Sequence, residues 1–197
     1  MATINLFGAS GHAKVIMDIL ESQGDSVGVL YDDSPHCSDI HGHRVIEASK
    51  TEVVGPLIVS VGHNPSRAEI AKRYETEYAR AVHKNAIVSE TAEIGNGTVV
   101  MQGAIIQADV TVGNHCIINT GASVDHECKI GDFVHISPHA TLCGNVSVGE
   151  GSWIGAGATV IPGIKIGRRC TIGAGSVVVR DLPDGATAYG NPCKIKR

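Results

Sequence analysis

The second half of the chain carries an aliphatic residue at every sixth position. The series begins at Val88 and runs without interruption to Val178, which makes sixteen consecutive matches. The residue two places before each of these positions is small or of modest size, with Ile164 as the exception. Chance does not produce such a run when about one residue in four is aliphatic. The repeat therefore predicts short strands whose aliphatic side chains stack in ladders.

A second, longer period of 18 residues is superimposed on the six-residue period. It is marked by glycines at one equivalent turn, namely Gly95, Gly113, Gly131, Gly149 and Gly167. Since eighteen is three times six, each coil has three short sides. The pattern predicts a parallel β-helix of triangular cross-section, with about five coils between residues 86 and 180.

The first third of the chain follows a different pattern. Residues 3–7, 27–31 and 57–61 predict strands, residues 13–23 and 66–75 predict helices, and residues 8–12 form a glycine-rich turn. This order is typical of a small Rossmann-like α/β domain, too short for a complete dinucleotide-binding fold. We expect a division into residues 1–82 for this domain, 83–180 for the β-helix and 181–197 for a C-terminal cap.

Composition narrows the class of protein further. The 24 glycines argue against a helical bundle. A hydrophobic content of 43% with a net charge of only −4 excludes a disordered chain. The same charge gives no reason to expect nucleic acid as a partner. No apolar run is long enough for a membrane helix and the N-terminus does not resemble a signal peptide, so we expect a cytoplasmic protein. The six cysteines are then expected to be free thiols.

The glycine turn has the features of a phosphate-binding loop. The segment Gly8-Ala9-Ser10-Gly11-His12 leads into a helix, whose N-terminal N–H groups and dipole favour an anion. Asp32 follows about 20 positions later, where a carboxylate binds a ribose hydroxyl in dinucleotide sites. These features indicate a nucleotide-diphosphate ligand, and the alternative is a purely structural turn and cap.

His126 is the strongest candidate for catalysis. It lies at a predicted corner of the β-helix between two carboxylates, Asp125 and Glu127. A neighbouring carboxylate fixes the imidazole tautomer, as a general base requires. One coil further on, residue 144 is a glycine, which leaves room for a thioester and offers a backbone N–H to an oxyanion.

The motifs together resemble the PglD/NeuD family of sugar acetyltransferases, nearly end to end. The resemblance rests on residues 8–12, 31–33, 62–67, 119–128, 134–137 and 190–192. It implies a left-handed β-helix, a homotrimer with sites between subunits, and acetyl-CoA as cosubstrate with no metal required. It also implies a catalytic base at His126 supported by Glu127, and a thioester site at His135 and Gly144. The positions that it assigns to the nucleotide sugar are Gly8, Ala9, Ser10, Gly11, His12, Asp32, Asp33, Asn64 and Asn119.

The implied reaction is direct N-acetylation of the 4-amino group of a nucleotide-linked amino-dideoxy sugar, a step in bacterial polysaccharide or glycoprotein biosynthesis. One alternative is O-acetylation of sialic acid or another sugar. Others are a non-catalytic hexapeptide-repeat scaffold, an NAD-binding redox module, and a metal-binding protein that uses a loop cluster of His36, Cys37, His41 and His43.

Overall fold

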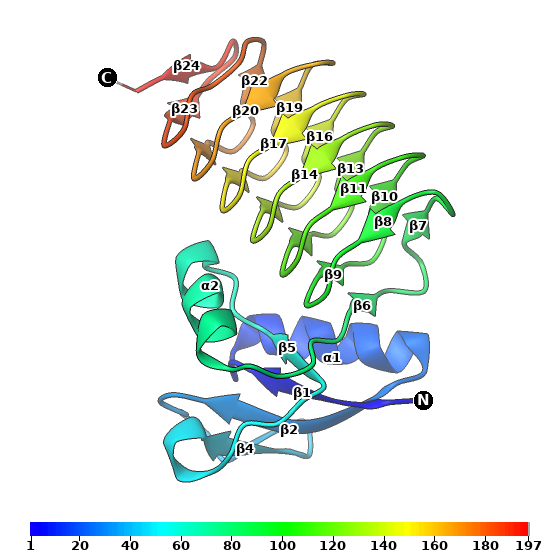
Figure 1. The fold of residues 1–197 in the computed structure, drawn as a ribbon, viewed down its shortest axis with the longest axis vertical. Coiled ribbons are helices and arrows are strands. Elements are labelled where there is room, and N and C mark those ends of the chain that lie inside the picture. The colour runs from blue at the N-terminus through cyan, green and yellow to red at the C-terminus, as the bar shows by residue number, and fades with distance from the viewer. Residues whose placement is uncertain (197) are drawn as a thin grey trace.

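The computed structural model describes residues 1–196 and contains an α/β unit followed by a β-helix (Figure 1). Arg197, the last residue of the predicted cap, lies outside the described residues. The α/β unit occupies one end of the long axis and the β-helix rises from it toward the C-terminus.

The α/β unit is built on a five-stranded sheet with strand order β3-β4-β2-β1-β5. Its strands are β1 (Thr3–Phe7), β2 (Ser26–Asp32), β3 (Asp39–Ile40), β4 (His43–Glu47) and β5 (Leu57–Val59). All pairs are parallel except β3 with β4. The sequence pattern predicts β1, β2 and β5 but misses β3 and β4. In β4 only Val45 is fully buried, so its apolar pattern is too short to indicate a strand.

Two α-helices and one short 3-10 helix complete the unit: α1 (Gly11–Gln23), α2 (Asn64–Arg73) and η1 (Ala48–Lys50). Both α-helices begin two residues before their predicted starts. Helix α1 ends at Gly24, whose φ of 89° is accessible mainly to glycine. In the described part of the chain, no helix is both long enough and apolar enough to span a membrane.

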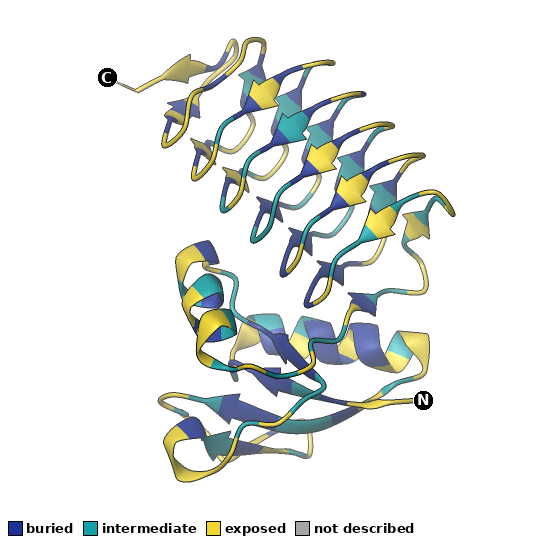
Figure 2. Ribbon diagram, viewed as in Figure 1, coloured by how far each residue is buried: buried dark blue, intermediate teal, exposed yellow. Residues whose placement is uncertain are grey.

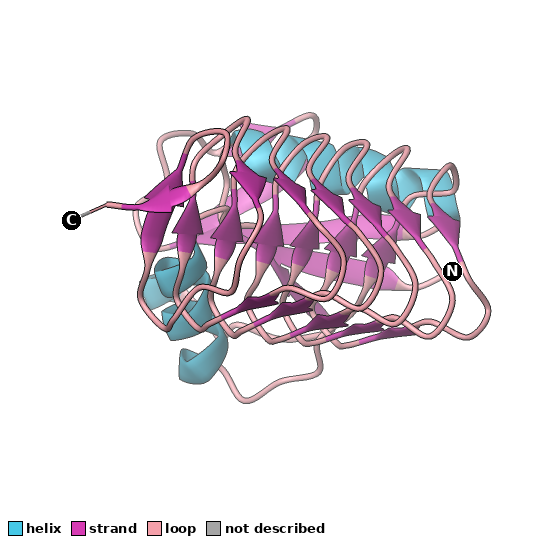
Figure 3. Cartoon of the chain, turned by 90° about the horizontal axis from the view of Figure 1, so that it is seen from above, coloured by secondary structure: helices cyan, strands magenta, loops and turns pink. Residues whose placement is uncertain are grey.

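The β-helix has three parallel sheets, which we call sheets I, II and III (Figure 3). Sheet I contains β6 (Ala81–Val82), β9 (Val99–Val100), β12 (Ile117–Ile118), β15 (His135–Ile136), β18 (Trp153–Ile154), β21 (Thr171–Ile172), β23 (Thr187–Tyr189) and the antiparallel β24 (Lys194–Ile195). Sheet II contains β7 (Ile87–Val88), β10 (Ile105–Ile106), β13 (Ser123–Val124), β16 (Thr141–Leu142), β19 (Thr159–Val160) and β22 (Val177–Val178). Sheet III contains β8 (Glu93–Ile94), β11 (Thr111–Val112), β14 (Lys129–Ile130), β17 (Ser147–Val148) and β20 (Lys165–Ile166).

Strand pairing follows the 18-residue period. Ile117, for example, pairs with Val99 on the preceding coil and with His135 on the following one. The sixth-position aliphatics fill the interior of the prism, where most of them are fully buried (Figure 2). Strand β6 already pairs with β9, so the β-helix begins at Ala81, inside the range assigned to the first domain.

The cysteines are free, and two of them occupy a side-chain ladder inside the prism. The Cys116 thiol donates to the Gly131 carbonyl at 3.0 Å, and the Cys170 thiol donates to the Pro183 carbonyl at 3.1 Å. On the coils between and before them, Ser152 and Thr98 donate through hydroxyls to the equivalent carbonyls at 2.8 Å. These cysteines therefore act as small hydrogen-bonding core residues.

The α/β unit packs against sheet I and the corner between sheets III and I. Val99, Met101 and Ile117 of the first coils belong to the same buried cluster as Ile16 and Leu20 of α1. Sheet I is thus partly covered within one chain, which matters for the position of the candidate site.

Candidate active site

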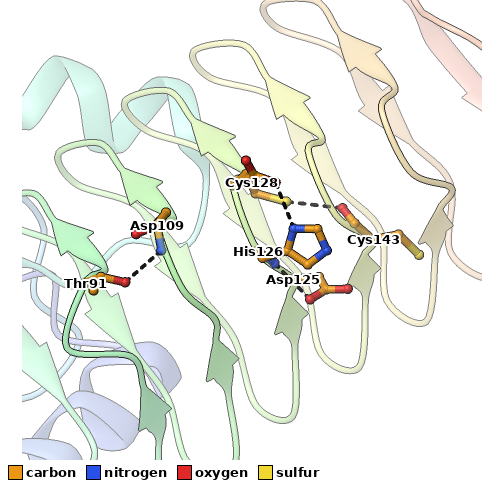
Figure 4. Close-up of polar contacts among 7 residues, drawn as sticks. Thr91, Asp109, Asp125, His126, Cys128 and Cys143 are labelled. Atoms are coloured by element: carbon orange, nitrogen blue, oxygen red, sulfur yellow. Dashed lines mark hydrogen bonds and ion pairs between the residues drawn. The ribbon is translucent and has the colours of Figure 1, made fainter.

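His126 lies in the turn that connects β13 of sheet II to β14 of sheet III. The Asp125 carboxylate accepts a hydrogen bond from the His126 backbone N–H at 2.8 Å and closes the turn (Figure 4). The His126 Nδ1 lies 3.1 Å from Glu127 Oε2. A carboxylate only accepts, so Nδ1 carries the proton and Nε2 keeps a free lone pair. Both side chains are exposed, at 57% and 64%, so the imidazole is accessible to a substrate.

Gly144 lies against this imidazole from the next coil. A Cβ atom on Gly144 would be 2.5 Å from His126 Cε1, so the ring can keep its position only beside a glycine. Among residues 1–196, the Gly144 N–H donates no hydrogen bond, whereas its neighbours Cys143 and Asn145 donate to other coils. The corner therefore presents a base and an unpaired backbone donor side by side.

His135 and Asn119 lie on sheet I, at a different place on the prism. Asn119 Nδ2 is 3.0 Å from His135 Nε2. Because an amide nitrogen only donates, Nε2 of His135 is an acceptor and the proton resides on Nδ1. Burial lowers the pKa of His135 to about 4, with Arg67 and His12 adding to the effect, so this ring is neutral near pH 7.

Trp153 covers His135 from the following coil. The two rings are parallel with centroids 5.6 Å apart, and Trp153 Nε1 donates to Ser137 Oγ at 2.7 Å. A mainly apolar cavity of about 430 Å³ extends from these residues along sheet I to Gly155, Ala156 and beyond. The sequence analysis did not identify Trp153 as a wall of a cavity.

The glycine turn adopts the expected form. Gly8 has a φ of 111° and its Cα faces Val61, where a Cβ would clash at 2.8 Å. The Ala9 N–H donates to Asp32 Oδ2 at 2.8 Å, so this carboxylate ties the turn to the end of β2. A cavity of about 370 Å³ is lined by Ala9, Ser10, Gly11, Lys14, Cys37, Asp39, Ile40 and His41. Lys14 and the 37–41 segment are lining residues that the sequence analysis missed.

Of the nine predicted substrate-binding residues, only Ala9, Ser10 and Gly11 line this cavity, and three of the others make contacts elsewhere. His12 is turned toward the β-helix, where burial and Arg67 lower its pKa to about 4. Asp33 forms an exposed ion pair with Arg73 at 2.7 Å. Asn64 is 4% exposed and donates to the carbonyls of Gly151 and Ser152, so its amide joins α2 to the β-helix.

Within one chain, the predicted site residues fall into separate places. His126, Glu127 and Gly144 are at the corner between sheets II and III, whereas Asn119 and His135 are on sheet I beside the α/β unit. The four residues of the loop cluster do not form a metal site: in the part of the chain that the structure describes, no group of three or more metal-ligating side chains comes together.

Comparison with known proteins agrees with this fold. Residues 3–74 match the PglD N-terminal domain, and residues 145–180 match the bacterial transferase hexapeptide repeats. The chain is 40% identical over 120 residues to UDP-N-acetylbacillosamine N-acetyltransferase of Bacillus subtilis, a match that spans 51% of this chain and only 52% of that relative.

Several solved structures match over nearly the whole chain, among them the following two complexes. One is a variant of perosamine N-acetyltransferase from Caulobacter crescentus in complex with CoA and GDP-perosamine, with 38% identity, a TM-score of 0.92, and coverage of 99% of this chain and 97% of that one. The other is the acetyltransferase domain of PglB from Neisseria gonorrhoeae in complex with acetyl coenzyme A, with 36% identity, a TM-score of 0.91 and 98% coverage of both chains.

The chain belongs to the PglD family of sugar acetyltransferases, which are acyltransferases of the hexapeptide-repeat class. The predicted fold class, a small Rossmann-like domain followed by a left-handed parallel β-helix, is confirmed. This membership leaves the scaffold, NAD-binding and metal-binding alternatives without support.

Proposed function

We propose that the protein transfers the acetyl group of acetyl-CoA to the 4-amino group of a nucleotide-linked amino-dideoxy sugar. The observation that carries the proposal is the corner at which the His126 imidazole, oriented by Glu127, lies against the bare backbone of Gly144. Base and oxyanion donor are the two groups that acyl transfer to an amine requires.

The proposed reaction uses the two groups of this corner that have no hydrogen-bond partner among residues 1–196, His126 Nε2 and the Gly144 N–H. The amine attacks the thioester carbonyl carbon while His126 Nε2 accepts its proton, and Glu127 stabilises the imidazolium through Nδ1. The Gly144 N–H stabilises the tetrahedral oxyanion, an interaction that contributes about 3 kcal/mol in other acyl transfers. Collapse of the intermediate breaks the C–S bond, forms the amide, and releases CoA as its thiolate.

The substrate assignment rests on the relatives and on the α/β unit. Two relatives that align over nearly the full chain were solved with ligands bound. One structure contains CoA and GDP-perosamine, and the other contains acetyl coenzyme A. In this chain the cavity beside the glycine turn contains backbone N–H groups at the start of α1 and the Lys14 ammonium, which suits a diphosphate. The nucleotide sugar would extend from this cavity toward His12, His135 and Asn119.

A homotrimer accounts for the separation of the site residues. His126 is on the corner opposite to sheet I, so the corner of one subunit would meet the sheet I face of its neighbour. The outward residues of sheet II, such as Ile87 and Ile105, are uncharged, whereas sheet III exposes Glu93, Lys129 and Lys165. An uncharged face is the better surface for association between copies.

The test is thiol release from acetyl-CoA with a panel of UDP-, GDP- and dTDP-linked 4-amino sugars and with sialic acid. We expect turnover of one nucleotide-linked amino sugar, a loss of at least about 100-fold in His126→Ala, and normal rates in Lys165→Ala. Turnover of sialic acid alone would transfer the assignment to O-acetylation. Failure to bind acetyl-CoA would overturn the acetyltransferase proposal for this site.

If each active site is shared between two subunits, two inactive variants should complement each other. Coexpressed His126→Ala and His12→Ala chains form mixed trimers in which some sites combine two intact halves. Activity should reappear in the mixture, although each variant alone is impaired. A mixture no more active than its components would contradict a site built from two chains.

A further inference from the structure

Arg67 is the largest fully buried side chain of the protein, at 1% exposure, and it lies between the two parts of the fold. Its five N–H donors are all used. Nε donates to the His115 carbonyl at 2.7 Å, and one terminal nitrogen donates to the Phe133 carbonyl at 3.0 Å, both on the β-helix. The remaining bonds go to Val61, Gly62 and Asn64 in the α/β unit.

This guanidinium has no carboxylate partner among residues 1–196. Four of its five acceptors are backbone carbonyls and the fifth is the Asn64 amide oxygen. Burial lowers the pKa of Arg67 to about 10, which still leaves it charged near neutral pH. Burial of a cation without a counter-charge costs stability, and here the five hydrogen bonds of the guanidinium offset part of that cost.

The charge adds to the effect of burial on three imidazoles, those of His12, His115 and His135. Arg67 is the one charged group that acts on His12, while Arg67 and His12 both act on His135. His12 belongs to the first turn of α1 and His135 to β15, so they approach the boundary from opposite sides. His12 Nε2 and His135 Nδ1 are both fully buried and have no hydrogen-bond partner in the described chain.

We propose that Arg67 is a positioning residue: its five hydrogen bonds fix the α/β unit on the β-helix, and this docking buries His12 and His135 as hydrogen-bonding groups at the boundary, where the Arg67 charge adds to the effect of burial in keeping them uncharged. An imidazolium pair here would repel its neighbours and would lose the ability to accept hydrogen bonds. His135 Nε2 already accepts from Asn119, so the ring atoms left for a sugar at this boundary are His12 Nε2 and the protonated Nδ1 of His135. The link to the sugar rests on the proposed function, whereas the effect on the two imidazoles does not.

The direct test is an NMR titration of the ring nitrogens in ¹⁵N-histidine-labelled protein. His12→Asn and His135→Asn assign the two resonances. In the unmodified protein both midpoints should lie near pH 4. In Arg67→Met both should rise by about one pH unit, because the neighbouring positive charge is gone. Arg80→Met is the control: Arg80 is exposed and also joins the chain before the β-helix to a coil carbonyl, that of Ile94.

Arg67→Lys separates the charge from the hydrogen bonds and serves if Arg67→Met does not fold. Lysine keeps the positive charge, but its ammonium has only three N–H donors. It therefore cannot replace the five hydrogen bonds by which Arg67 joins the two parts of the fold. We expect midpoints like those of the unmodified protein together with a KM for the nucleotide sugar raised about tenfold, while Arg80→Met changes neither. Unchanged midpoints in a folded Arg67→Met, or an unchanged KM in Arg67→Lys, would overturn the proposal. Absence of any turnover in the unmodified protein would overturn the proposed function and leave the titration result intact.

Discussion

The Gly144 backbone and the His126 ring are in direct contact across one coil of the β-helix. A Cβ at residue 144 would lie 2.5 Å from Cε1 and 2.6 Å from Nε2 of the imidazole, closer than any real Cβ contact. The 18-residue coil length creates this contact, and the absence of a side chain at residue 144 makes it possible. This one pair of residues therefore sets both the position of the imidazole and the place of the unpaired N–H of Gly144, which is itself a buried residue.

Gly144→Ala should lower activity without unfolding the protein. The new methyl group must displace the exposed His126 ring, and a displacement of about 1 Å costs on the order of 100-fold in rate. We expect kcat to fall by about that factor while the melting temperature changes little. Steady-state kinetics with thermal unfolding of the same sample measures both. Full activity in this variant would mean that the observed ring position is not the catalytic one.

Glu127→Gly should stabilise the fold and impair the reaction. Glu127 has a φ of 59°, a left-handed conformation that costs a non-glycine residue about 1 kcal/mol. Glycine relieves this cost but removes the partner of His126 Nδ1. We expect a raised melting temperature with a kcat reduced at least about tenfold.

Asp109→Gly is the matched control for that variant. Asp109 lies at the equivalent turn position one coil earlier, also with a φ of 59°, and its N–H donates to Thr91, which is not a predicted site residue. It should show the same gain in stability with unchanged kcat. Equal loss of activity in both variants would assign the effect to turn flexibility instead of the carboxylate.

His115 makes stability depend on pH. This ring is 8% exposed, and burial together with Arg67 lowers its pKa to about 4 in the folded protein. The unfolded state then binds more protons between pH 4 and pH 6.5, so the stability contributed by the neutral ring is complete above pH 6.5 and is lost as the pH falls toward 4. The loss has an upper bound of about 3 kcal/mol.

His115→Phe should flatten this dependence. The ring of Phe133 stacks on His115 at 5.1 Å, and Phe133 occupies the same turn position one coil on with a φ of 58°, so the corner accepts a phenyl group in this conformation. Denaturant unfolding at several pH values from 4 to 7 gives the slope for both proteins. Identical slopes would show that His115 does not titrate with folding.

Cys116→Ser should leave stability nearly unchanged, because the hydroxyls of Thr98 and Ser152 already bond the equivalent carbonyls in the same ladder. Cys116→Val should cost about 1–3 kcal/mol, since it leaves the buried Gly131 carbonyl without the thiol donor. Denaturant unfolding under reducing conditions compares the two variants. A serine variant as unstable as the valine variant would show that the ladder depends on the volume of the sulfur atom.

The repeat made the β-helix predictable in detail. Aliphatic positions such as Val124 and Ile130 recur with fixed spacing, and every coil buries them in the same way. The period of the sequence therefore gives the register of the strands directly. The contact between His126 and Gly144 follows from the same addition of 18. Strands β3 and β4 escaped prediction because each contains a single buried residue, Ile40 and Val45 respectively, which leaves almost no hydrophobic pattern.

The sequence by itself determined the coil length, the inward-facing ladders, the glycine turn and the residues of the corner at His126, since each depends on local spacing. Only the tertiary structure decided which face of the prism the α/β unit covers. That choice buried Arg67, turned His12 and Asn64 toward the β-helix, and separated His135 from His126. The physical reason is that docking of the two units depends on their shapes and on hydrogen bonds between residues far apart in the chain, such as Arg67 with Phe133. A local sequence pattern carries no information about such long-range contacts.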